Sequence, residues 1–94
     1  MYGESMDRVA AFGALAYLLA EGVRGEYSME VSGDYAVFRL DIPVWAKLSP
    51  QSKKSLAKLA ETAELHEETR DSFYVKHVYH LLRHLPDSEN SENS

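Results

Sequence analysis

The chain of 94 residues contains no cysteine. Without cysteine there is no disulfide framework, no thiol nucleophile and no thiolate ligand set for a zinc ribbon or an iron–sulfur cluster. The sequence also lacks a glycine-rich phosphate loop, a nucleophile elbow and a pair of carboxylates at catalytic spacing. We therefore expect a protein that is not an enzyme and that binds no cofactor or small-molecule substrate.

No apolar run is long enough to cross a membrane. The longest stretch, "VAAFGALAYLLA" at 9–20, would rise only about 18 Å as a helix, against a hydrocarbon core of about 30 Å. The segment before it carries Glu4 and Asp7 against Arg8 alone, unlike the basic start of a signal peptide. These features favour a cytoplasmic protein without a membrane partner.

Strong positive charge is absent, since the net charge is −5. That value argues against non-specific coating of nucleic acid, although three acidic residues lie in the C-terminal "PDSENSENS" and leave the rest closer to neutral. We predict a flexible leader at 1–4, a single α+β domain at 5–85 and a disordered acidic tail at 86–94.

A β-hairpin is the clearest pattern that is present, in "EYSMEVSGDYAVFRLDI" at 26–42. With Gly33-Asp34 at the centre of a two-residue turn, Ser32 pairs with Tyr35 and the apolar residues of both strands share one face. Glycine at the first turn position suits a type II′ turn. The predicted apolar face consists of Tyr27, Met29, Val31, Ala36, Phe38, Leu40 and Ile42.

Three helices are expected around this hairpin. The first runs from about residue 5 to 21, with Gly22 and Gly25 ending it. The second is capped by Ser49, starts at Pro50 and runs to about residue 66. A third is expected at about 71–85, stopped by Pro86. The predicted order is helix, two-stranded antiparallel hairpin, helix, helix, with the apolar face of the hairpin packed on helices.

Two strands alone make a marginal sheet, and the first helix has no polar side between residues 9 and 20. We therefore expect a homodimer. A second copy pairing along the strand Tyr35–Asp41 would complete a four-stranded antiparallel sheet. The alternative interface is the first helix.

Histidines gather in the predicted third helix, where His77, His80 and His84 share one arc. Only neighbouring pairs could bind one metal ion, because His77 and His84 would lie about 10.5 Å apart along the axis. The favoured interpretation is a structural helix flank, so no metal site is assigned. A metal- or pH-responsive role, with a further ligand such as His66 or Glu67, stays an alternative.

Candidate partner-binding residues fall in three places. Trp45 lies in a loop between two prolines, where it could cap the core or anchor a partner. A basic patch follows, and the polar face of the second strand is open. These candidates are Trp45, Lys47, Lys53, Lys54, Lys58, Tyr35, Val37 and Arg39.

The leading interpretation is a small homodimeric interaction or regulatory module that binds another macromolecule, preferably an acidic protein surface. The alternative is a DNA-binding regulator, since a strand followed by two helices is the element order of ribbon–helix–helix repressors.

Overall fold

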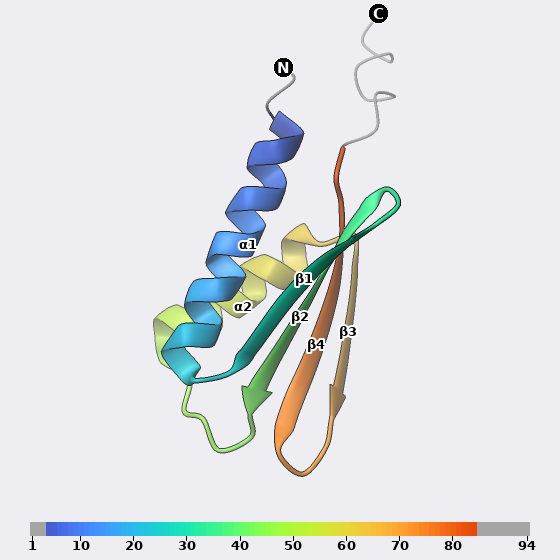
Figure 1. Cartoon of the computed structure of the whole chain (residues 1–94). Helices are drawn as coiled ribbons and strands as arrows, with labels where there is room; N and C mark the ends of the chain where they lie inside the picture. The colour runs from blue at the N-terminus through green and yellow to red at the C-terminus, as the bar shows by residue number, and fades with distance from the viewer. Residues whose placement is uncertain (1–3, 85–94) are drawn as a thin grey trace, which may run out of the picture.

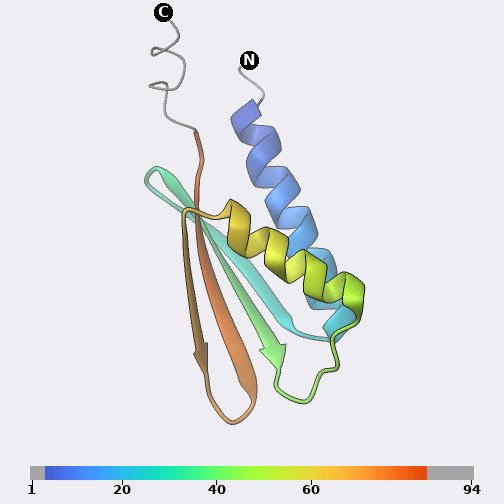
Figure 2. The same ribbon diagram turned by 180° about the vertical axis from the view of Figure 1, so that it is seen from behind.

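The computed structural model describes residues 4–84, so the predicted tail at 86–94 and residues 1–3 of the predicted leader lie outside the described range. Its elements, in chain order, are α1 (Glu4–Val23), β1 (Glu26–Ser32), β2 (Tyr35–Pro43), α2 (Pro50–Thr62), β3 (Leu65–Arg70) and β4 (Tyr74–Leu82) (Figure 1). The four strands form one antiparallel sheet in the order β1-β2-β4-β3. Both helices lie on the same face of this sheet (Figure 2), and no described element covers the other face.

The first hairpin has the predicted register, and the α+β class is confirmed. Ser32 pairs with Tyr35, and Met29 pairs with Phe38. Gly33 has a φ of 64°, as the first position of a type II′ turn requires.

The sheet is completed within the chain, which the sequence analysis did not predict. The far side of β2 pairs with β4, from Tyr35 opposite Leu82 to Pro43 opposite Tyr74. The expected pairing of this strand with a second copy of the chain is therefore wrong, because its edge is already occupied.

The predicted helix at 71–85 is also wrong, since this segment forms a turn and strand β4. Aromatic and β-branched residues are frequent in "YVKHVYHLL", and they favour an extended backbone. Asp71, at the start of the predicted helix, closes a tight turn instead. Its carboxylate accepts hydrogen bonds from the backbone N–H groups of Phe73 and Tyr74, at 2.8 and 2.7 Å. A helix cap and a tight turn use the same kind of bond.

The two helix predictions before that point hold in part. α1 lies where expected, and the start of α2 is confirmed: the Ser49 side chain accepts a hydrogen bond from the backbone N–H of Ser52, with Pro50 as the first helical residue. α2 ends at Thr62 rather than near residue 66. The chain joins the sheet just after Thr62, because the backbone N–H of Glu64 donates to the carbonyl of His80 at 3.0 Å.

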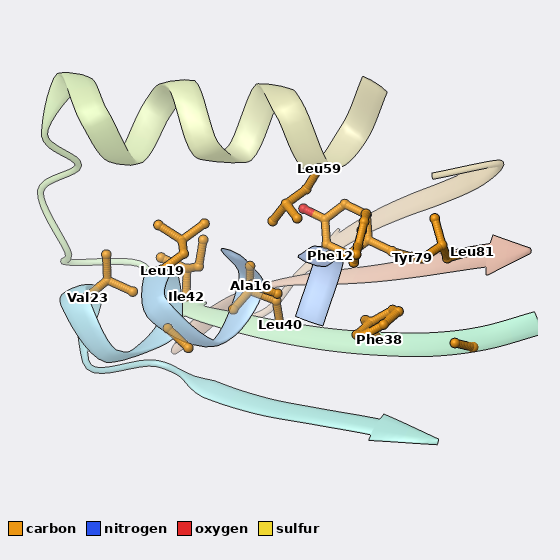
Figure 3. Close-up of a cluster of buried hydrophobic side chains, with 12 residues drawn as sticks. Phe12, Ala16, Leu19, Val23, Phe38, Leu40, Ile42, Leu59, Tyr79 and Leu81 are labelled. Carbon is orange, nitrogen blue, oxygen red and sulfur yellow. The ribbon is translucent and has the colours of Figure 1, made fainter. Parts of the chain in front are cut away.

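The hydrophobic core lies between the sheet and the two helices. α1 supplies one inward stripe, and Leu59 of α2 points toward Tyr79 of β4 (Figure 3). The outer side of α1 is uncovered, with Leu18 65% exposed, so this helix is not enclosed on all sides. No helix within residues 4–84 is long and apolar enough to span a membrane. The buried cluster comprises Phe12, Ala16, Leu19, Ala20, Val23, Ala36, Phe38, Leu40, Ile42, Leu59, Tyr79 and Leu81.

One arrangement, a helix followed by a two-stranded hairpin, occurs twice in the chain. We name α1-β1-β2 the first unit and α2-β3-β4 the second unit. Each helix end and strand start in the second unit lies 39 positions after its counterpart: residues 23 and 62, 26 and 65, 35 and 74. The hairpin registers agree as well, since the pair Glu26↔Asp41 corresponds to Leu65↔His80. The sequence hides this repeat, because Tyr35 and Tyr74 are the only identical pair in the strands at this offset.

Candidate functional site

An aromatic hollow of about 340 Å³ lies where three segments meet at one end of the sheet. These segments are the α1–β1 connection, the loop after β2 and the β3–β4 turn, all at the lower end in Figure 1. The backbone N–H of Val44 donates to the carbonyl of Phe73 at 2.9 Å, which ties the loop to the turn. The lining residues are Arg24, Pro43, Val44, Trp45, Ser72, Phe73 and Tyr74.

Trp45 and Phe73 are the most exposed large apolar side chains among the described residues, at 69% and 71%. Trp45 therefore does not cap the core, which was the favoured of its two expected roles. Phe73 was not predicted as a site residue, because its place beside Trp45 depends on the β3–β4 turn. Large aromatic side chains at the rim of a hollow are typical of partner-binding anchors.

Arg24 brings a positive charge and an unusual backbone to this hollow. Its φ is 59°, in the left-handed region that glycine normally occupies after a helix. The N–H of Gly25 donates to the carbonyl of Ala20 at 2.8 Å, which completes a Schellman cap around Arg24. The left-handed backbone of Arg24 has a small cost in conformational free energy, and this backbone places a positively charged side chain at the hollow.

The predicted basic patch is exposed but separate from the sheet. The side chain of Lys47 lies in the loop two residues after Trp45, and the other three lysines lie on α2. All four are exposed, and no ion pair to them is present among the described residues. The four residues are Lys47, Lys53, Lys54 and Lys58.

The predicted residues of β2 lie on the uncovered face of the sheet. Val37 is only 7% exposed there, since neighbouring strands flank it on both sides. Tyr35 lies at the end of β2 far from Trp45, since the strand from Tyr35 to Pro43 spans about 27 Å at 3.4 Å per residue. Tyr35, Val37 and Arg39 therefore do not form one surface with the aromatic hollow.

The three histidines of the predicted arc are dispersed by strand geometry. His77 points to the helix side of the sheet and is 6% exposed, whereas His80 points to the uncovered face. His84 lies beyond the end of β4 and is exposed. The arc that motivated the metal alternative does not exist.

A different cluster forms instead between β3 and β4. Glu68 lies directly opposite His77, and His66 lies two residues earlier on the same face of β3. The Nε2 atom of His66 is 3.0 Å from Nδ1 of His77, and that Nδ1 atom is 4.0 Å from Oε1 of Glu68. One ligand atom from each of the three side chains lies within 4.8 Å of the other two.

Burial determines the protonation of His77 in this cluster, and stacking fixes the position of the His66 ring. Burial lowers the pKa of His77, and the nearby His66 lowers it further, against the opposing charges of Glu68 and Asp41. The ring of His66 stacks on Tyr79 with centroids 4.5 Å apart. His77 is therefore neutral at pH 7, and the His66 ring is held in place by an aromatic neighbour.

Comparison of the chain with protein-family models, with curated proteins and with solved structures gives no match.

Proposed function

We propose that this chain is a non-enzymatic interaction module that binds an apolar segment of a partner protein in the hollow between Trp45 and Phe73. The observation that carries the proposal is the exposure of these two side chains, which both line one hollow. An exposed aromatic pair leaves apolar area in contact with water, and a partner side chain inserted between the rings would remove it.

The charges around the hollow favour a partner segment that also carries a carboxylate. Arg24 lines the hollow, and Lys47 is two residues from Trp45. A guanidinium pairs well with a carboxylate, either from an acidic side chain or from a chain terminus. Acidic and apolar residues next to each other are therefore the expected recognition signal.

Binding can be tested with peptides selected from a random library against the full chain. Trp45 is the only tryptophan, so its fluorescence reports directly on the hollow. We expect the selected peptides to be rich in aromatic or aliphatic residues next to Asp or Glu, and to shift the Trp45 emission to shorter wavelength.

Variants distinguish this hollow from other apolar surfaces. Phe73→Ala and Trp45→Ala should each weaken peptide binding at least about tenfold by calorimetry, which is the effect of losing an interface anchor. The matched control is Leu18→Ala, which removes a similarly exposed apolar side chain on α1. Selected peptides that bind the Trp45→Ala variant as tightly as the wild type would refute the proposal.

A further inference from the structure

We propose that His66, Glu68 and His77 form a binding site for a divalent transition metal ion of the zinc class. The site lies on the helix side of the sheet, between the edge strand β3 and its neighbour β4. It is independent of the aromatic hollow and shares no residue with it.

The donor atoms have a spacing that a small adjustment converts into a coordination sphere. In a tetrahedral zinc site with bonds of about 2.1 Å, neighbouring ligand atoms are about 3.4 Å apart. The two nitrogens are 3.0 Å apart, and Oε1 of Glu68 is 4.0 Å from the nearer of them. The Glu68 side chain is 58% exposed, so it is free to rotate toward the ion. Two imidazoles and one carboxylate would leave a coordination position for water.

The protonation state suits metal binding. A histidine must be neutral to coordinate, and burial keeps His77 neutral at pH 7. In the hydrogen bond between Nε2 of His66 and Nδ1 of His77, one proton lies between two nitrogens that would otherwise repel each other. A metal ion at this point would take the place of that proton, which would move to the other nitrogen of the same imidazole ring, and the ion would gain the charge of Glu68 as well.

The repeat shows that the backbone does not require these residues. At the offset of 39 positions, His66 corresponds to Tyr27 and His77 corresponds to Phe38, while Met29 is the counterpart of Glu68. The first unit thus places three apolar side chains at the same points of the same hairpin. The second unit replaces all three with metal-ligating side chains, and the change converges on one point in space.

Metal binding can be tested on the untagged full chain by titration with Zn²⁺, followed by calorimetry and thermal unfolding. We expect one ion per chain and a rise in melting temperature, because a ligand that binds only the folded state stabilises it. Co²⁺ provides a second readout, since tetrahedral cobalt absorbs strongly in the visible region and hydrated cobalt does not.

The variants separate this site from the other histidines and acids. His66→Gln and Glu68→Gln change exposed side chains outside the buried core cluster, and each should weaken Zn²⁺ binding at least about tenfold. His80→Gln and Glu67→Gln are the matched controls on the uncovered face and should bind as the wild type does. No stabilisation of the wild type by Zn²⁺, or stabilisation that persists in His66→Gln and Glu68→Gln, would overturn the proposal.

Discussion

The two hairpins share one register but differ in chemistry. In the first unit, Phe38 is fully buried, and its ring packs against Phe12 of α1 with centroids 4.7 Å apart. In the second unit, His77 occupies the equivalent position and contacts His66 instead. The difference follows from the helices: α1 packs over β2 and half-buries Tyr27 of β1, whereas α2 packs on α1 and β4 and leaves every residue of β3 exposed. The same hairpin backbone can therefore carry either core residues or a polar cluster, depending on how much of the hairpin the helix covers.

The largest expected difference in stability between the two units comes from truncating the side chains at the two equivalent positions. Phe38→Ala should lower the free energy of unfolding by about 3–5 kcal/mol, because it opens a cavity in the buried core. His77→Ala should cost only about 1–2 kcal/mol, since one side of that residue faces the poorly covered strand β3. Urea denaturation of both variants measures this. Equal losses would show that the second hairpin is packed as tightly as the first.

The next largest effect on stability is expected at the junction between α1 and β1. A Cβ atom added at Gly25 would collide with the backbone carbonyl oxygen of Asp41, so the backbone must shift. Gly25→Ala should therefore cost about 1–3 kcal/mol. Gly22 is the matched control: a Cβ there meets nothing within 4 Å, and Gly22→Ala should stabilise α1 by about 0.5–1 kcal/mol. Similar melting temperatures for the two variants would contradict this account of the junction.

Acidification should weaken the second unit through His77. Its pKa is lowered by burial and by His66, so below pH 6.5 the unfolded chain binds a proton that the folded chain resists. Stability is then complete above pH 6.5 and declines as the pH falls from there toward the lowered pKa of the folded state. Glu68 and Asp41 moderate the effect. Measured with chelator present, the wild type should lose stability between pH 7 and 5, and His77→Phe should lose less. Parallel curves would remove His77 as the cause.

The smallest expected effect concerns the end of α1, where the two units also differ. Arg24 has a φ of 59°, whereas Ala63, its counterpart after α2, is extended with a φ of −71°. Arg24→Gly should raise the free energy of unfolding by about 0.5–1 kcal/mol by relieving the left-handed conformation. The same variant should weaken peptide binding at the hollow. A stability loss in thermal unfolding would show that the Arg24 side chain has a structural role.

Local chemistry made the first half of the fold predictable. The Gly33 turn, the alternation on either side of it and the Ser49-Pro50 helix start each depend on neighbouring residues, and the structure confirms all three. β3 and β4 were missed because their inward residues include His66, Glu68 and His77, which break the apolar alternation that reveals a strand. The pairing of β4 with β2 is non-local and leaves no local signal.

The candidate sites were predictable only in part, for the same reason. Trp45 was identified by residue type alone, but its companion Phe73 requires the β3–β4 turn. A helix would have grouped His77 with His80, whereas a strand directs them to opposite faces. The partner of His77 is therefore His66, from a segment that the sequence pattern assigns to the end of a helix.

We expect that the fold carries the ionisable cluster of the second unit without needing it for stability. The most direct measurement is thermal unfolding, with and without Zn²⁺, of a variant that gives the second hairpin the residues of the first: His66→Tyr, Glu68→Met and His77→Phe. We predict a cooperative transition at or above the wild-type temperature without metal, and no response to Zn²⁺. A variant that unfolds below the wild type, or one that Zn²⁺ still stabilises, would contradict the account.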